Sequence, residues 1–308
     1  MSLAGQTILL TGGTGTFGRH FLDFVLSKHE DVTVRVYSRD ELKQSELRAK
    51  LAGRQNVRFL VGDVRDATRL HRAAEGCDVI VHAAALKQVP SCEYNPFEAV
   101  KTNVLGTQNV VEAALDCGVP RSILISSDKA VNPINTYGAT KLLAEKVFVQ
   151  SNAYAGGRDI RFSCVRYGNV IGSRGSVLEV FREQAASGTV TITDPEATRF
   201  WLTPQTAVDF VLRSLDIMRG GEVFVPELPS MKVVDLVPQG CKIEVIGLRP
   251  GEKLHELLIA NDEVIYRIGG FVNQSLVMHD ASYLAKGPYS SDDNTEWITR
   301  EEFEAMSS

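Results

Sequence analysis

The chain has 308 residues, of which 44% are hydrophobic and 23% are charged, and its formal net charge is −5. This length can bury a large core, and the mild negative charge provides no basic surface for nucleic acid or for an anionic membrane. No apolar run approaches the ~18 residues of a membrane span, and the N-terminus leads into a strand pattern rather than a signal peptide, so we expect a cytoplasmic protein.

The cysteines and histidines do not indicate a metal site. The five cysteines are scattered without a CxxC pair, and the six histidines lack HExxH or other ligand spacing. An odd number of separate cysteines does not suit a disulfide framework either. We therefore expect reduced, structural cysteines and no bound metal.

Short β-branched runs alternate with longer helical patterns as far as Phe162. The predicted strands are Gln6–Thr11, Val32–Tyr37, Val57–Val61, Asp78–His82, Ser122–Ser126 and Ile160–Arg166. The predicted helices are Phe17–Lys28, Glu41–Ala52, Ala67–Glu75, Glu98–Cys117 and Tyr137–Ala155. This alternation predicts an α/β fold with a Rossmann-like, doubly wound parallel sheet and helices on both faces.

After Gly168 the pattern changes to shorter elements that are separated by turn-rich segments such as Gly172–Ser176 and Pro226–Pro229. We therefore expect a cofactor-binding domain over residues 1–168, which also carries the candidate catalytic residues. Residues 169–308 would form mainly a smaller C-terminal substrate-binding lobe and a tail. From about Asn273 the chain is polar and weakly periodic, which predicts a tail ordered only by packing on the body or on another subunit.

A glycine-rich turn, Thr11-Gly-Gly-Thr-Gly-Thr-Phe-Gly18, follows the first predicted strand and opens the first helix. In this context Gly12 permits the tight turn, Gly15 lets the backbone approach a pyrophosphate, and Gly18 allows close helix packing. The predicted cofactor contacts from this turn are Gly12, Thr14, Gly15, Thr16, Phe17 and Gly18. The alternative is a glycine-rich turn without a ligand.

The end of the second predicted strand bears on the choice between NAD and NADP. An NAD site normally carries Asp or Glu there, whereas this chain reads Tyr37-Ser-Arg-Asp40. Arg39 and Lys43 lie one helical turn apart and suit a 2′-phosphate, to which Ser38 could donate a hydrogen bond. Asp40 keeps NAD open, and an ordinary helix cap is its other explanation. We predict NADP.

Two further strand ends point to the same crevice. Asp63, followed by Val64, is expected to reach the adenine, and Ala83, Ala84 and Ala85 would let the nicotinamide half pass close to the backbone. Alternatively, Asp63 caps the next helix and the alanines are simply core residues.

Tyr137 and Lys141 lie four residues apart on a predicted helix that follows the segment Ser126–Ala130. The Lys141 ammonium could lower the pKa of the Tyr137 phenol, which could then act as a base toward a hydroxyl. Such a pair alone is often just a surface pair. At the carboxyl ends of the strands of this fold, the spacing predicts that both residues serve catalysis and contact the cofactor.

Together these motifs resemble the extended short-chain dehydrogenase/reductase superfamily, from about Gln6 to Glu256. Longer phrases resemble the inverting UDP-N-acetylglucosamine 4,6-dehydratases of the polysaccharide biosynthesis type. These phrases are Tyr37–Ser45, His82–Lys87, Ser127–Lys141, Arg166–Gly175, Thr198–Trp201 and Arg249–Lys253. Asp128-Lys129 is the distinguishing pair, because sugar dehydratases of the wider superfamily usually carry Asp-Glu there. Ser127 replaces the usual threonine and is counted with the catalytic residues.

The resemblance implies an internal hydride transfer through NADP. Tyr137 would remove the 4-hydroxyl proton while hydride leaves C4, giving a 4-keto sugar with an acidic C5 proton. Lys129 would take that proton, with a pKa lowered by partial burial and by nearby lysines. Asp128 would protonate the departing 6-hydroxyl, the hydride would return to C6, and C5 would gain a proton from the opposite face.

By the same resemblance, Asn169 and the Ser173–Ser176 turn would hold UDP, and Arg199 and Arg249 would pair with its diphosphate. Glu252 would meet the ribose hydroxyls or would cap a helix at Leu254. The predicted substrate residues are Lys87, Asn169, Ser173, Arg174, Ser176, Arg199, Arg249 and Glu252.

Asn103 would either hold the helix near Tyr137 or be a buried polar kink. Apolar stripes over Val100–Leu115 and Leu142–Phe148 would pair across a two-fold by resemblance, so we expect a homo-oligomer, either a dimer or a hexamer. A UDP-sugar 4-epimerase is the competing enzyme, and it needs no acid/base pair for eliminating water, which Lys129 would supply. A non-catalytic NADP-sensing protein would not need the Tyr–Lys pair.

Overall fold

A single large sheet organises the molecule, and the computed structural model describes residues 3–173, 175–263, 265–268, 271–275, 283–284 and 288–307. Its parallel strands are β1 (Thr7–Thr11), β2 (Thr33–Ser38), β3 (Val57–Val61), β4 (Val79–His82), β5 (Arg121–Ile125), β6 (Arg161–Val165) and β10 (Glu222–Val225). They lie in the order β10-β6-β5-β4-β1-β2-β3. The chain thus reverses direction along the sheet between β1 and β4, which places the ligand crevice of this fold there.

The sheet continues beyond β10 with antiparallel strands. These are β15 (Phe271–Ser275), β14 (Ile265–Ile268) and β16 (Tyr283–Leu284), in that order outward. The six strands predicted from the sequence are confirmed, each within one residue at either end.

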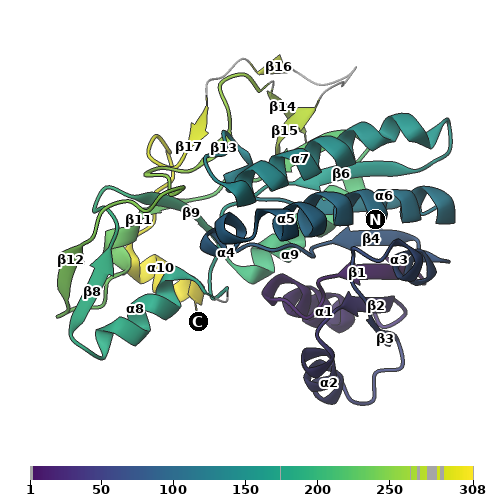
Figure 1. The fold of residues 1–308 in the computed structure, drawn as a ribbon, viewed down its shortest axis with the longest axis horizontal. Coiled ribbons are helices and arrows are strands. Elements are labelled where there is room, and N and C mark those ends of the chain that lie inside the picture. The colour runs from purple at the N-terminus through teal and green to yellow at the C-terminus, as the bar shows by residue number, and fades with distance from the viewer. Residues whose placement is uncertain are drawn as a thin grey trace.

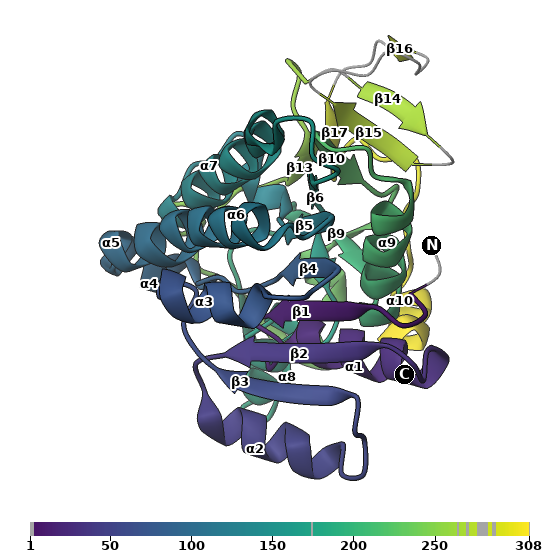
Figure 2. The same ribbon diagram turned by 90° about the vertical axis from the view of Figure 1, so that its right-hand side faces the viewer.

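Helices cover both faces of the sheet (Figures 1 and 2). One face carries α1 (Thr16–Lys28), α2 (Glu41–Lys50) and α9 (Pro204–Ile217), and the other carries α3 (Ala67–Ala74), α6 (Gly106–Cys117) and α7 (Thr136–Gln150). Alternate residues of a strand point to opposite faces, so Ile8 and Leu10 pack in the first layer while Leu9 packs in the second. The doubly wound prediction is confirmed.

The helix predicted over Glu98–Cys117 is divided into α5 (Pro96–Ala99), a π-helix (Val100–Leu105) and α6. Asn103 in the π-helix is buried, and its amide exchanges hydrogen bonds with both backbone groups of Leu86 at 2.8 and 2.9 Å. It also donates to Thr140 Oγ1 on α7 at 3.0 Å. Asn103 therefore is a buried polar kink that also holds the neighbouring helix, and π-helical turns are frequent at functional sites.

A smaller lobe lies to one side of the sheet (Figure 1). Its elements are β7 (Asn169–Val170), α8 (Val177–Ala185), β8 (Thr189–Ile192), β9 (Thr198–Leu202), β11 (Ser230–Lys232), β12 (Lys242–Val245) and α10 (Arg300–Ser307). Trp201 and Phe303 meet edge to face with ring centroids 5.0 Å apart, so α10 packs on the lobe core. Because α9 and β10 return to the main sheet, the sheet domain and the lobe alternate along the second half of the chain.

In the part of the chain that the structure describes, no helix has the length and apolar character needed to cross a membrane.

Candidate active site

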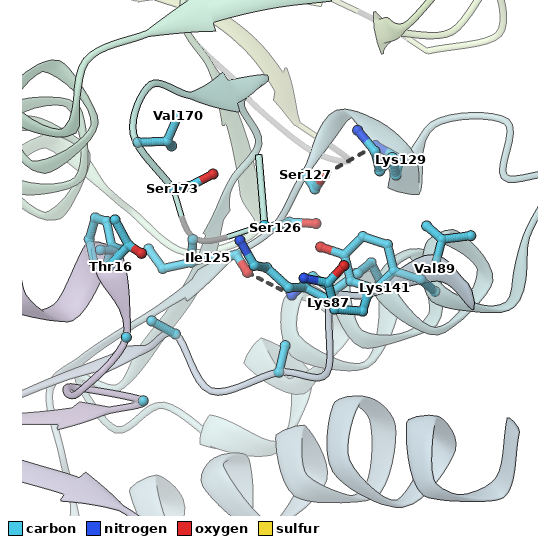
Figure 3. Close-up of a pocket in the computed structure, with 18 of the residues that line it drawn as sticks. Thr16, Lys87, Val89, Ile125, Ser126, Ser127, Lys129, Lys141, Val170 and Ser173 are labelled. Carbon is cyan, nitrogen blue, oxygen red and sulfur yellow. Dashed lines mark hydrogen bonds between the residues drawn. The ribbon is translucent and has the colours of Figure 1, made fainter. Parts of the chain in front are cut away.

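One cavity of about 830 Å³ opens at the carboxyl ends of the parallel strands and extends to the lobe. It is lined by every described residue that was predicted for cofactor, substrate or catalysis. Arg174 lies outside the described residues. Figure 3 shows Thr16 at one side of this cavity and Ser127 with Lys129 at the other. The structure brings the predicted residues together, and their individual roles stay predictions.

The glycine-rich turn between β1 and α1 fits a dinucleotide. Gly12 has φ +67°, and a Cβ there would lie 2.8 Å from the Ala84 backbone nitrogen. A Cβ on Gly18 would lie 2.5 Å from Gly13 Cα, so only glycine lets α1 pack on the turn. Gly15 is the N-cap of α1 and supplies no side-chain cap, which leaves the helix N-terminus open to a phosphate.

The two cationic side chains at the end of β2, Lys43 and Arg39, differ in how closely a carboxylate pairs with them. Asp40 is the N-cap of α2, where it accepts from Lys43 N at 3.0 Å and pairs with Lys43 Nζ, which lowers the pKa of Asp40. The capping explanation for Asp40 is therefore confirmed. Arg39 is half-exposed, with its guanidinium 3.8 Å from the Asp63 carboxylate. Ser38 Oγ accepts a hydrogen bond from Gln44 at 3.0 Å.

Asp63 does not cap the helix that follows it. Asp66 does so, accepting from Arg69 N at 2.9 Å, and the capping explanation for Asp63 is wrong. Asp63 instead pairs with Arg65 at 2.6 Å. Ala83 and Ala84 are half-buried at the cavity wall, where the backbone of Gly12 approaches them.

Tyr137 and Lys141 both project from α7 into the cavity and are buried. The helix begins next to the catalytic turn because Asn135 caps it, accepting from Gly138 N at 2.7 Å. A Cβ on Gly138 would lie 2.2 Å from the Lys129 carbonyl oxygen, so the helix start packs directly on that turn.

Burial changes the pKa values of the Tyr–Lys pair. It lowers the pKa of Lys141 to about 8, with Glu145 opposing the shift, and Lys141 Nζ donates to the Ile125 carbonyl at 2.6 Å (Figure 3). Burial also raises the pKa of Tyr137 to about 12, while the Lys129 ammonium and a hydrogen bond with Ser127 oppose that rise. The predicted net fall in the phenol pKa is therefore wrong in this structure, and Lys129 is a cation that opposes the rise.

A single 3-10 turn, Asp128–Ala130, brings Asp128 and Lys129 to the same cavity. Ser127 stabilises the turn, because its hydroxyl accepts from Lys129 N at 3.3 Å and donates to Asp128 Oδ1 at 2.6 Å. The buried Asp128 carboxylate lies 3.2 Å from Lys129 Nζ. An acidic and a basic group are thus held in contact at the cavity wall.

Glu256 is a site residue that the motif analysis missed. Its Oε1 lies 3.2 Å from Lys129 Nζ, although Glu256 is far from the catalytic turn in sequence. Burial alone would lower the pKa of Lys129, but the carboxylates of Asp128 and Glu256 outweigh burial and raise it. The predicted fall in the pKa of Lys129 is therefore wrong. Glu256 stands three residues after the phrase Arg249–Lys253, and its short spacing from that phrase was the available signal.

The loop 249–256 is fastened over the catalytic segment by two hydrogen bonds. Lys253 Nζ donates to the Val131 carbonyl at 2.5 Å, and Asn135 Nδ2 donates to the Gly251 carbonyl at 2.7 Å. Lys253 also lines the cavity, and burial lowers its pKa although Glu256 opposes this. Substrate and catalytic regions are therefore joined across the cavity.

Arg199 on β9 is held by backbone carbonyls and by two glutamates. Its guanidinium is largely buried and donates to the carbonyls of Thr198 and Leu254 at 2.7 and 2.9 Å. Glu252 accepts from Thr193 Oγ1 at 3.0 Å and lies 3.5 Å from Arg199. No helix forms at Leu254, so the capping explanation for Glu252 is wrong.

The remaining predicted substrate residues surround the same end of the cavity. Partial desolvation of its ammonium at the cavity wall lowers the pKa of Lys87, and Arg249 is exposed at the rim. Asn169, Ser173 and Ser176 line the side formed by the lobe.

Comparison with known proteins places this geometry in a family. The chain matches the model of the polysaccharide biosynthesis protein family over residues 8–269. It is 42% identical over 321 residues to the UDP-N-acetylglucosamine 4,6-dehydratase (inverting) of Campylobacter jejuni subsp. jejuni serotype O:23/36 (strain 81-176), covering 97% of this chain and 96% of the relative. This similarity confirms the predicted resemblance.

Two further similarities span most of the molecule. The UDP-glucose 4-epimerase of Rickettsia akari (strain Hartford) is 37% identical, with 90% of this chain and 85% of that protein covered. The crystal structure of Pen from Bacillus thuringiensis superposes with a TM-score of 0.91 at 37% identity, covering 99% and 98% of the two chains. The chain belongs to the polysaccharide biosynthesis protein family.

Proposed function

We propose that this chain is a nucleotide-sugar 4,6-dehydratase, a lyase that converts UDP-N-acetylglucosamine to a UDP-4-keto-6-deoxy sugar with inversion at C5. The observation that carries the proposal is the contact between Asp128 and Lys129 at the wall of the cavity that also holds Tyr137. An acid and a base in contact suit the elimination of water from adjacent carbons. We keep the cytoplasm as the expected compartment.

NADP is the cofactor that we propose. The open N-terminus of α1 suits the pyrophosphate, and Arg39 at the end of β2 suits a 2′-phosphate. Lys43 is already paired with Asp40, so Arg39 is expected to contribute most of the preference over NAD. When bound, the nicotinamide would accept hydride from C4 and return it to C6.

Tyr137 is proposed to receive the 4-hydroxyl proton. Its pKa of about 12 in this structure requires help from nearby positive charge before the phenolate forms. Lys129 supplies one such charge, and Lys141 supplies another one helical turn along α7. Ser127 is placed beside Tyr137 to orient the same hydroxyl.

The elimination needs a free amine and a protonated carboxyl, whereas Lys129 and Asp128 rest as an ion pair 3.2 Å apart. A proton that moves from Lys129 Nζ to the Asp128 carboxylate creates both groups at once without exchange with solvent. The Lys129 amine then takes the C5 proton and becomes an ammonium. Asp128 gives its proton to the departing 6-hydroxyl, which leaves as water and restores the carboxylate.

A UDP-sugar 4-epimerase is the second candidate, because a relative of that name is 37% identical over most of the chain. An epimerase would share Tyr137 and Lys141 and would leave the 6-hydroxyl in place. Epimerisation would require no acid or base from Asp128 and Lys129 at the sugar, and we therefore favour the dehydratase.

We also propose a homo-oligomer. Much of the predicted stripe on α6 is turned to the core, including Val110 and Val111. Several exposed apolar side chains instead lie on α4 (Val89–Tyr94), α5, the π-helix and α7, where Phe97 is 79%, Leu105 47% and Leu143 50% exposed. Covering this surface with a second copy would remove it from water.

Mass spectrometry tests the proposed activity directly. Wild-type protein with NADP⁺ and UDP-N-acetylglucosamine should give a product lighter by one water. When the mass is unchanged, proton NMR distinguishes a C4 epimer, which would favour the epimerase, from unreacted sugar, which would reject both enzymes if the protein is folded and loaded with NADP.

A further inference from the structure

Glu256 occupies a protected position that the proposed mechanism leaves without a task. It directly precedes β13 (Leu257–Ile259) and is 2% exposed. Its backbone is fixed on both sides by Ser291, because Glu256 N donates to Ser291 Oγ and Ser291 N donates to the Glu256 carbonyl, each at 2.9 Å. The side chain nevertheless lines the cavity. The position of Glu256 is therefore fixed by its burial and its backbone hydrogen bonds.

The two carboxylate oxygens of Glu256 have different surroundings. Oε1 lies 3.2 Å from Lys129 Nζ and 3.8 Å from Arg199 Nε. Oε2 is buried and has no hydrogen-bond partner among the described residues. The other charged groups that face this carboxylate are Lys253 on its own loop and Asp128 on the catalytic turn.

A buried acceptor without a donor is costly, and almost all such atoms in proteins are hydrogen-bonded. The carboxylate is already held in place through Oε1, and Oε2 is closed off from the cavity in this structure. Since Glu256 lines the cavity, a rotation of the carboxylate about its last side-chain bond is the movement that would turn Oε2 toward a molecule there. The unpaired oxygen is thus an acceptor that an O–H or N–H group of the ligand could satisfy.

Given the proposed function, the position of Lys129 indicates which group of the sugar is the donor to Glu256. Lys129 would act at C5, and the two oxygens of one carboxylate are close together, so the donor lies near C5 of the sugar. Tyr137 and Ser127 are assigned to the 4-hydroxyl. The 3-hydroxyl and the acetamido group stand on the other side of the ring. The hydroxyl on C6, next to C5, is the donor that remains.

We propose that Glu256 Oε2 accepts a hydrogen bond from the 6-hydroxyl of the sugar and thereby makes the site specific for a 6-hydroxylated substrate. The 6-hydroxyl would donate to Glu256 while its oxygen faces Asp128. When Asp128 delivers a proton to that oxygen, the leaving water is still held by Glu256. The arrangement orients the leaving group and rejects sugars that lack it.

A binding cycle tests this contact without turnover. The dissociation constants of UDP-N-acetylglucosamine and of its 6-deoxy analogue are measured by calorimetry with saturating NADP⁺. The two proteins are Tyr137→Phe and the double variant that adds Glu256→Gln, and Tyr137→Phe keeps the sugar intact during the measurement. UDP alone serves as the probe of folding. The matched control is Glu196→Gln, which replaces a glutamate that forms an exposed ion pair with Lys232.

Glu256→Gln should weaken binding of UDP-N-acetylglucosamine by about 10- to 100-fold, as expected for a hydrogen bond to a charged group. It should change binding of the 6-deoxy analogue and of UDP by less than about twofold, the usual margin of a neutral change. Equal weakening of both sugars would mean that Glu256 acts only through Lys129 or the fold, and no weakening would mean that it makes no contact. Either result overturns the proposal.

Should the double variant fail to bind UDP, the Tyr137→Phe protein still decides the matter. It must bind UDP-N-acetylglucosamine more tightly than the 6-deoxy analogue by a similar factor, and equal affinities reject the contact. A failure of the proposed function would look different, because the wild-type protein would then leave UDP-N-acetylglucosamine unconverted whatever these affinities are.

Discussion

Replacing the buried Lys141 by Met should stabilise the cofactor-free protein at pH 7 while removing its activity. The fall in pKa from 10.5 to about 8 means that keeping the ammonium charged inside the fold costs about 3 kcal/mol. Met removes that cost. It also leaves the Ile125 carbonyl without its donor, a loss of about 1 kcal/mol. The net gain of about 2 kcal/mol corresponds to a rise of roughly 3 °C in Tm for a chain of this size.

The stabilisation by Lys141→Met should depend on pH. Because the folded-state pKa of Lys141 is depressed, the cost is fully present below pH 8 and disappears as the pH rises toward 10.5. The stabilisation of Lys141→Met should therefore be largest near neutral pH and should vanish near pH 10. Scanning calorimetry at several pH values measures it, with the exposed Lys146→Met on the same helix as the control. Destabilisation at pH 7, or a gain that does not depend on pH, would refute the reasoning.

Three further outcomes are expected. Arg39→Ala should erase most of the preference for NADP in fluorescence titrations, because an ion pair with the 2′-phosphate is lost; equal affinity of wild-type protein for NAD and NADP would contradict this. Lys129→Met should keep the transient NADPH absorbance but lose C5 exchange and methyl formation by about 100-fold or more, and near-normal exchange would show that Lys129 is not the base. Leu143→Glu, a charge placed at an exposed apolar position, should shift the mass in light scattering toward the monomer; a wild-type monomer at micromolar concentration would sink the oligomer proposal.

The sheet domain could be predicted from the sequence because its signals are local. Short β-branched strands, amphipathic helices and the turn Gly12–Gly18 each specify their own conformation, and right-handed crossovers then leave one arrangement. The cavity could be predicted for a related reason, since carboxyl ends of parallel strands meet at one edge. Residues as distant in sequence as Arg39 and Tyr137 accordingly line the same cavity.

The remaining features depend on contacts between distant segments. Glu256 raises the pKa of Lys129 from another loop, and no local pattern reports that distance. The π-helix contains Asn103, which bonds to Leu86, 17 positions earlier in the sequence. The return of α9 and β10 to the main sheet is also decided by packing, since their patterns suit either part of the molecule equally well.

Proton NMR of the wild-type protein in D₂O, with NADP⁺ and UDP-N-acetylglucosamine, tests the central claim most directly. The account predicts a new methyl signal from C6, deuterium at C5, and transfer of the original C4 hydrogen into that methyl group. An unchanged spectrum from folded, NADP-loaded protein would contradict the account, and so would a product that keeps its C6 hydroxymethyl group.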